Sequence, residues 1–157
     1  MLLPNNVVEL RSLQTLSISD GRLLVGLDLR NLSSLQDLAI SRTWPPDIVL
    51  PSSLASLAII DVENLNSISK EILHSLNSLQ ELHISNCPKL RTLPRKDLPP
   101  LLGYLSIENC QHLKQQHFEA KGDYLHLTRS IPCIMIDHHQ VEPCLKERLK
   151  LASSLCF

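Results

Sequence analysis

The sequence predicts an α/β-type solenoid, a right-handed coil with a short-stranded parallel sheet on its concave side and mostly loop or turn returns. Three observations predict this fold class. The phrase LxxLxI recurs five times in the 157 residues, at steps of 22, 19, 25 and 23 residues. Apolar and polar residues alternate within each copy, which is the periodicity of a strand with one buried face. The segments between the copies are short and rich in Pro, Ser, Asn and Asp, which favours loops and tight turns.

Each copy carries apolar residues at its first, fourth and sixth positions. These residues are Leu13, Leu16 and Ile18; Leu35, Leu38 and Ile40; Leu54, Leu57 and Ile59; Leu79, Leu82 and Ile84; and Leu102, Leu105 and Ile107. A fixed apolar signature with a period of about 20–29 residues is typical of leucine-rich repeats. Because every copy has the same polarity along the chain, consecutive strands must pair in parallel, and the return segments supply the crossovers.

Strands are expected at the third to seventh positions of each copy, each about three to five residues long. The corresponding ranges are 15–19, 37–41, 56–60, 81–85 and 104–108. One short helical piece is predicted within residues 70–76, and residues 131–136 are interpreted as a sixth copy.

Residues 1–137 are predicted to form one leucine-rich repeat domain of about five to six repeats. Leu3-Pro4 resembles Leu93-Pro94 in the middle of a later repeat, so we expect an N-terminally incomplete coil whose end a longer protein or a partner covers. Residues 138–157 are predicted to be a tail or cap, with Pro143 in the first turn of a short helix. The alternative for this tail is a basic amphipathic helix that binds a membrane or a partner.

Composition and charge exclude several classes of protein. The formal net charge of −1 and the short basic stretches give no nucleic-acid footprint. No segment approaches the roughly 18 consecutive apolar residues of a membrane span. The first ten residues, MLLPNNVVEL, lack the basic and apolar regions of a signal peptide, and an odd count of five cysteines favours reduced thiols. We therefore predict a cytoplasmic protein without nucleic-acid or membrane partners.

Two groups of cysteine and histidine residues are candidate chemical sites. Cys87 and Cys110 both occupy the ninth position of their copies, where a small buried structural thiol is the commoner role. A redox pair or a metal site is the alternative for these two residues. The second group, Cys133, His138, His139 and Cys144, lacks a standard zinc spacing, so we predict no metal and solvent-exposed side chains instead.

Three segments resemble the C-terminal leucine-rich repeats of plant intracellular immune receptors, the disease resistance proteins of the coiled-coil NLR class. They are LSSLQDLAI (32–40), LNSLQELHISNCPKL (76–90) and LLGYLSIENCQHL (101–113). The stretch 112–137, which ends in IPCIMID, is similar to the last repeat of that family. The resemblance spans roughly residues 3–137, and the Cys-Pro-x-Leu at 87–90 makes it more specific. It implies a plant defence role as a ligand-sensing and autoinhibitory repeat region.

The chain departs from that family where nucleotide chemistry would be found. Family members carry a GxxxxGK[ST] phosphate loop, and this sequence has no match to it, so ATP or ADP binding is not carried over and no cofactor is predicted. The sequence also lacks a nucleophile elbow and an H-E-x-x-H motif. We therefore predict that the chain is not an enzyme and has no catalytic residues.

The candidate binding residues lie on the predicted concave face, at the third, fifth, seventh and eighth positions of the copies. The predicted partner-binding residues are Asp20, Asp37, Arg42, Ile60, Asp61, Glu81, His83, Tyr104 and Glu108. With Asp137 from the sixth copy, the whole row holds six carboxylates and one arginine, a net charge of −5 against −1 for the chain. An acidic row favours a basic ligand and speeds its approach. The alternative is that these residues are ordinary solvated side chains.

Protein–protein recognition is the function that these patterns favour. The resemblance implies a pathogen effector, a host target or the receptor's own nucleotide-binding module as the protein partner. One alternative is the substrate-recognition repeats of a ubiquitin-ligase adaptor, which an F-box-like segment before the repeats would identify. Another is a non-functional receptor fragment. The sequence identifies neither the ligand nor the oligomeric state.

Overall fold

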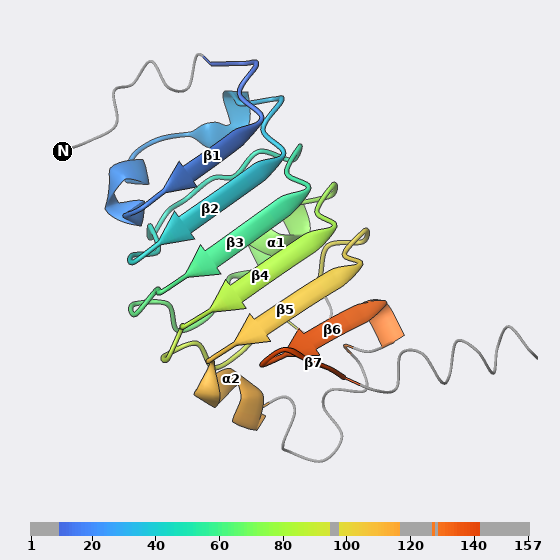
Figure 1. Ribbon diagram of the computed structural model, residues 1–157. Helices are drawn as coiled ribbons and strands as arrows, with labels where there is room; N and C mark the ends of the chain where they lie inside the picture. The colour runs from blue at the N-terminus through green and yellow to red at the C-terminus, as the bar shows by residue number, and fades with distance from the viewer. Residues whose placement is uncertain (1–9, 95–97, 117–126, 128, 142–157) are drawn as a thin grey trace, which may run out of the picture.

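The computed structural model describes residues 10–94, 98–116, 127 and 129–141. Within them the chain forms one seven-stranded sheet whose strand order follows the sequence, β1-β2-β3-β4-β5-β6-β7. The strands are β1 (Thr15–Ile18), β2 (Asp37–Ser41), β3 (Ser56–Ile60), β4 (Glu81–Ser85), β5 (Tyr104–Glu108), β6 (Cys133–Ile136) and β7 (His139–Gln140). Figure 1 shows β1 to β6 side by side, with the return segments behind them. The fold class predicted from the sequence is confirmed: the sheet is open and mostly parallel, and few helices accompany it.

The strands pair copy against copy, without a slip in register. Leu38 of β2 lies opposite Leu57 of β3, and Ile40 lies opposite Ile59. The same pairing continues through β4 and β5, where Leu82 lies opposite Leu105. Two columns of leucine and isoleucine therefore cross the inner face of the sheet. A one-residue slip would turn every one of these side chains to the solvent side, so the apolar pattern itself sets the register.

The residues interpreted as a sixth copy contain β6, which pairs in parallel with β5 and places Ile134 opposite Leu105. The chain then reverses direction. β7 pairs antiparallel with β6 and lies at the edge of the sheet. This hairpin includes the first residues of the predicted tail; the rest of that tail, with its expected helix, lies outside the described residues. The boundary that we place after Asp137 stays a prediction.

Short helices occupy the described parts of the return segments. α1 (Lys70–Ser75) confirms the helix predicted within residues 70–76, and the Ser69 side chain caps it by accepting a hydrogen bond from the backbone of Ile72. The other three were expected as loops: η2 (Gly21–Leu24), η3 (Leu29–Asn31) and α2 (Gln111–Lys114). No helix within the described ranges has the length and apolar character needed to cross a bilayer.

The core lies between the sheet and the returns. Leucine and isoleucine supply most of it, and Leu57, Leu82 and Leu105 are fully buried. Burying each such side chain contributes about 1.5–3 kcal/mol. Trp44, in the return after β2, is 7% exposed, and its backbone exchanges two hydrogen bonds with the Asn64 side chain in the next return. Each layer is thus held to the next on both sides of the coil, which leaves the opposite face of the sheet as a separate surface.

Candidate functional site

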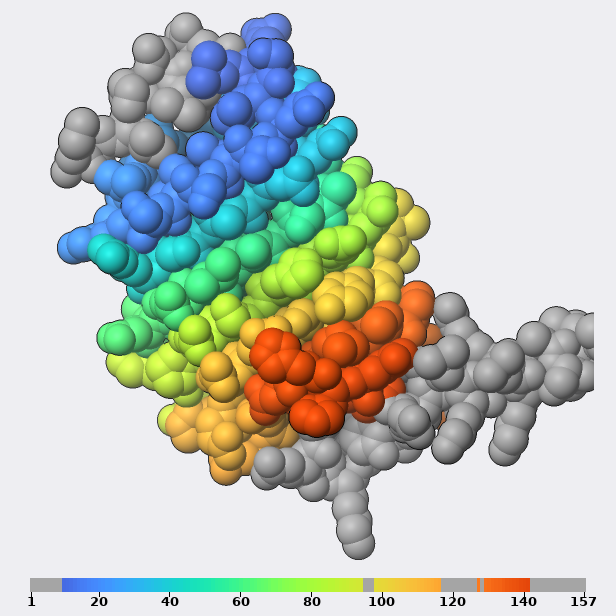
Figure 2. Space-filling view, viewed as in Figure 1, coloured from blue at the N-terminus to red at the C-terminus, as the bar shows by residue number. Residues whose placement is uncertain are grey.

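The outer sheet face consists of the side chains of β1–β6 that point away from the core. Register places them in three columns that cross the strands. The columns are Thr15, Asp37, Ser56, Glu81, Tyr104 and Cys133; Ser17, Ala39, Ala58, His83, Ser106 and Met135; and Ser41, Ile60, Ser85 and Glu108. Figure 2 shows the β1–β6 face as one broad surface toward the viewer. Six of the nine predicted binding residues lie in the strands on this face: Asp37, Ile60, Glu81, His83, Tyr104 and Glu108.

Negative charge dominates the outer sheet face. Its strand positions hold the carboxylates of Asp37, Glu81 and Glu108, and no described strand position on this face holds a lysine or arginine. Polar neighbours orient two of these carboxylates. The Thr15 hydroxyl donates to Asp37 Oδ2 at 3.3 Å, and His83 Nε2 lies 3.3 Å from Glu81 Oε2. The carboxylates on β2, β4 and β5 therefore favour the approach of cationic groups to this part of the face.

Two acidic residues of the predicted row are already paired with cations. Asp20 forms an ion pair with Arg22 at 2.5 Å, and hydrogen bonds from Arg22 lower the pKa of the Asp20 carboxyl to about 2. Asp137 forms a short ion pair with Lys114 of α2, whose hydrogen bond lowers the pKa of the Asp137 carboxyl. Of the six acids in the row, Asp37, Asp61, Glu81 and Glu108 form no ion pair with a lysine or arginine among the described residues.

The eighth positions form a rim at the carboxyl ends of the strands. Arg42, Asp61, Asn86 and Asn109 all have positive φ, between 50° and 66°. At these four residues the chain turns from the sheet into the return segment. Asn and Asp adopt the left-handed conformation more readily than most other residues. Predicted binding residues Arg42 and Asp61 therefore lie on this rim rather than on the flat of the sheet.

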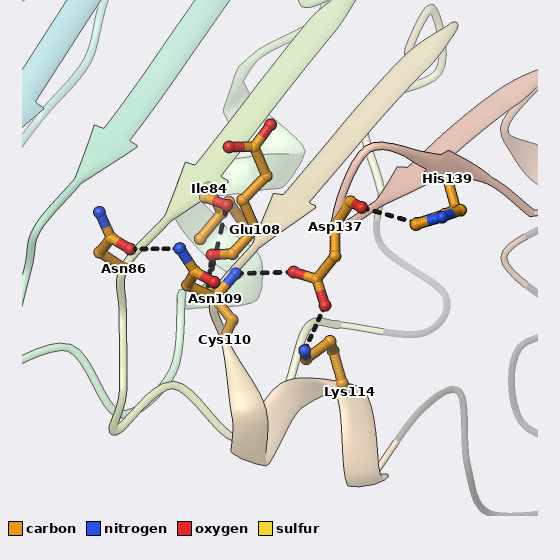
Figure 3. A network of polar contacts seen from close by, with 8 residues as sticks. All are labelled: Ile84, Asn86, Glu108, Asn109, Cys110, Lys114, Asp137 and His139. Atoms are coloured by element: carbon orange, nitrogen blue, oxygen red, sulfur yellow. Dashed lines mark hydrogen bonds and ion pairs between the residues drawn. The ribbon is translucent and has the colours of Figure 1, made fainter.

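Hydrogen bonds connect the rim from repeat to repeat (Figure 3). Asn109 Nδ2 donates to Asn86 Oδ1 at 2.9 Å. Asn86 Nδ2 in turn donates to Asp61 Oδ1 of the preceding repeat at 2.7 Å. At the last repeat the Asn109 backbone N–H donates to Asp137 Oδ1 at 2.9 Å. An open hollow of about 450 Å³ lies beside this ladder and is lined by Asp61, Glu63, Asn86, Pro88 and Asn109. The ladder was not foreseen, although Asp, Asn and Asn at equivalent positions signalled it.

Apolar and aromatic contacts lie among the charges. The rings of His83 and Tyr104, which both belong to the predicted set, have centroids 5.3 Å apart and planes inclined by 45°. Ile60 is half-buried at the end of β3. Ser106 lies between His83 and Met135 in the middle column and is only 7% exposed. Its place in the row was predicted, but its burial was not, because burial there depends on the sizes of neighbours on three strands.

The two ninth-position cysteines are buried structural thiols, as predicted. Both are fully buried, and the Sγ atoms of Cys87 and Cys110 donate weak hydrogen bonds to the carbonyl oxygens of Ile59 and Ile84, each at 3.9 Å. A hydrogen bond with Cys110 and burial raise the pKa of the Cys87 thiol. These thiols fill the site where the chain turns inward and supply donors to carbonyls of the preceding strand.

Three of the four residues of the second candidate cluster lie within the described part of the chain. Cys133 is half-buried in β6, whereas His138 and His139 are exposed at the β6–β7 turn, and Cys144 lies outside the described residues. His138 Nδ1 lies 3.4 Å from Glu108 Oε1, and His139 Nδ1 contacts the Asp137 carbonyl oxygen at 2.8 Å. In the part of the chain that the structure describes, no three His, Cys, Asp or Glu side chains converge as a metal site would require.

Comparison with known proteins gives one informative similarity. The chain is 31% identical over 115 residues to an Arabidopsis thaliana protein named "Putative disease resistance protein". The matched region is 69% of this chain but only 8% of the length of that relative. No family model matches the chain. The described residues thus form an open, mostly parallel repeat sheet, and the chain is similar to a region of a plant disease resistance protein.

Proposed function

We propose that the chain is a protein-recognition module that binds a basic protein surface on its outer sheet face. The observation that carries this proposal is the composition of that face, with three carboxylates and no lysine or arginine at its described strand positions. The helices α1 and α2 lie in the returns and leave this face uncovered. A broad surface with a negative field and central aromatic and apolar contacts suits protein binding better than catalysis on a small substrate.

The similarity supports placing this module in plant defence. By resemblance it corresponds to the C-terminal repeats of a cytoplasmic receptor of the coiled-coil NLR class, which sense ligands and restrain the receptor. The partner is then a pathogen effector, a host target or the receptor's own nucleotide-binding module. We propose no enzymatic activity for the chain.

Site-specific photo-cross-linking tests whether the outer sheet face binds a protein. A photoreactive amino acid is placed at Ala58, in the middle column, and at Asn77, an exposed residue in a return, in two separate variants. In plant cell extract we expect the Ala58 variant to capture a discrete protein that the Asn77 variant does not. The captured protein is identified by mass spectrometry and purified for binding measurements. Equal capture from both positions, or none from Ala58, would refute the proposal.

Charge reversal tests the electrostatic part of the proposal with that purified partner. The variant carrying Asp37→Lys, Asp61→Lys and Glu81→Lys should bind at least about tenfold more weakly, a loss of about 1.4 kcal/mol, mainly through slower association. Circular dichroism should remain that of the parent, because all three side chains are exposed or on the rim. The control reverses Asp47 and Glu71, which are exposed in the returns, and should leave the affinity within about twofold. Unchanged affinity in the triple variant would refute the acidic contact.

A further inference from the structure

Ser106 is a buried polar side chain without a partner on the outer sheet face. It is 7% exposed, and the strand alternation points it away from the core, since its neighbours Leu105 and Ile107 are fully buried on the inner face. Among the described residues its hydroxyl has no hydrogen-bond partner. Buried hydroxyl groups are nearly always hydrogen-bonded, so an unpaired one at the floor of an exposed surface indicates a place where a ligand group binds.

The surroundings of Ser106 specify the chemistry of that group. His83 and Met135 flank it on the two neighbouring strands, and Tyr104 and Glu108 lie two residues away on its own strand, on the same face. Glu81 lies opposite Tyr104 and contacts His83 at 3.3 Å. Strand register thus places two carboxylates and two rings on the strand positions around the Ser106 hydroxyl, on the same face of the sheet. The described strand positions of this face supply no lysine or arginine, so histidines are the basic groups beside these carboxylates: His83 beside Glu81, and His138, from the β6–β7 turn, 3.4 Å from Glu108 Oε1.

We propose that Ser106, Tyr104, Glu108, His83 and Met135 form a subsite for one arginine side chain of the protein partner; this proposal rests on the proposed function. A guanidinium group is planar and always charged, and it carries five N–H donors. It can stack on the ring of Tyr104 while it donates to the Glu108 carboxylate and to the Ser106 hydroxyl oxygen. A lysine ammonium can pair with the carboxylate, but it lacks the flat surface for stacking and the fork for two simultaneous acceptors.

The test uses acetyl-arginine amide as the probe, added to the full chain and followed by NMR. The methyl signal of Met135 and the amide signals of Tyr104 and Ser106 should shift and saturate. Acetyl-lysine amide should bind more weakly. Acetyl-citrulline amide, which has nearly the same shape without the charge, should give no saturable shift. Equal shifts from arginine and citrulline probes would overturn the proposal.

Ser106→Ala removes only the hydroxyl and should fold normally, because alanine already occupies the same column at Ala39 and Ala58. We expect it to weaken binding of the arginine probe at least threefold, and Glu108→Gln to weaken it more. Ser56→Ala, in another column of the face, should leave binding unchanged. Undiminished binding by Ser106→Ala would overturn the role of the hydroxyl.

The two proposals fail in different ways. If the cross-linked partner binds the face while the arginine probe gives no saturable shift, the subsite is wrong and the recognition surface stands. If the probe binds through Ser106 and Glu108 but Ala58 captures no protein, the recognition proposal is wrong and the subsite would be left as a small-molecule guanidinium site.

Discussion

Single residues on the rim combine an unusual backbone conformation with a side-chain role. Asn86 and Asn109 have φ of 52° and 50° and also form the hydrogen-bonded ladder with Asp61. The left-handed conformation costs most residues about 1–2 kcal/mol, and less for Asn. Glycine would adopt the same left-handed conformation without strain, but the sequence has only four glycines and none at these positions. The rim therefore needs asparagine for two separate reasons, and substitution can separate them.

Substitutions at Asn109 should distinguish backbone strain from the lost hydrogen bond. Asn109→Gly keeps the positive φ and loses the amide contact to Asn86, so we expect a loss of about 1 kcal/mol in the free energy of unfolding. Asn109→Ala loses both and should cost about 2–3 kcal/mol. Urea denaturation measures both values. Equal stability of the two variants would show that the left-handed turn carries no strain.

The sequence predicted single residues correctly where the position in the repeat alone determines whether a side chain is buried or faces outward. The alternation in each copy identified Cys87 and Cys110 as buried and His83 and Tyr104 as outward-facing, and each follows from the position in the repeat. The pairing of Asp20 with Arg22 and of Asp137 with Lys114 was not predicted, because ion pairs depend on where the returns bring their cations. The functional role of the predicted binding residues stays a prediction.

Elements of secondary structure follow the repeat in the sheet but less closely in the returns. The five predicted strands and α1 lie where the apolar pattern or a capping serine indicated them. The helices η2 and η3 were missed, although each follows an aspartate whose side chain accepts from the backbone two residues later, at Arg22 and Arg30. Asp-x-Arg at both places was a usable capping signal. A single turn ends too soon to show helical periodicity.

The first return passes so close to the second repeat that only glycine fits at its start. A Cβ atom on Gly21 would lie 1.8 Å from the Thr43 carbonyl oxygen, which belongs to the backbone of the next layer. We therefore expect Gly21→Ala to separate η2 from that layer and to cost about 1–3 kcal/mol. Thermal unfolding by circular dichroism measures the change.

Gly103 gives the matched control for that substitution. Its nearest neighbours would lie 3.9 Å from an added Cβ, an ordinary contact distance. Gly103→Ala should therefore change the unfolding temperature little or raise it slightly, since alanine restricts the unfolded chain. A similar loss in both variants would contradict the close approach at Gly21.

On the scale of the whole molecule, stability is a sum over adjacent layers, because each repeat contacts mainly its neighbours. Besides the β5–β6 ladder and the buried Ile134, one carboxylate links the last described layer to its neighbours. Asp137 accepts from the Asn109 backbone and pairs with Lys114, and it therefore joins the β6–β7 turn to β5 and α2. A small change at Asp137 is expected to act on the C-terminal layer first.

The lowered pKa of Asp137 makes this joint sensitive to acid. A depressed carboxyl pKa adds stability that is fully present above the unfolded value of about 3.9 and is lost as pH falls through the folded value. The parent should therefore unfold at a higher temperature than Asp137→Asn at neutral pH, and the difference should shrink in acid. The matched control is Asp47→Asn, at an exposed carboxylate that takes part in no ion pair among the described residues. A constant difference at all pH values would contradict the assignment.

Register is kept although the steps between copies range from 19 to 25 residues. The inner columns accept leucine or isoleucine at fixed spacing, while differences in length are absorbed on the far side of the coil. A whole repeat can therefore be inserted or deleted by unequal recombination without changing the register of the repeats that remain. Each outward position can also change one codon at a time without disturbing the buried columns, so the outer sheet face can vary while the framework stays unchanged.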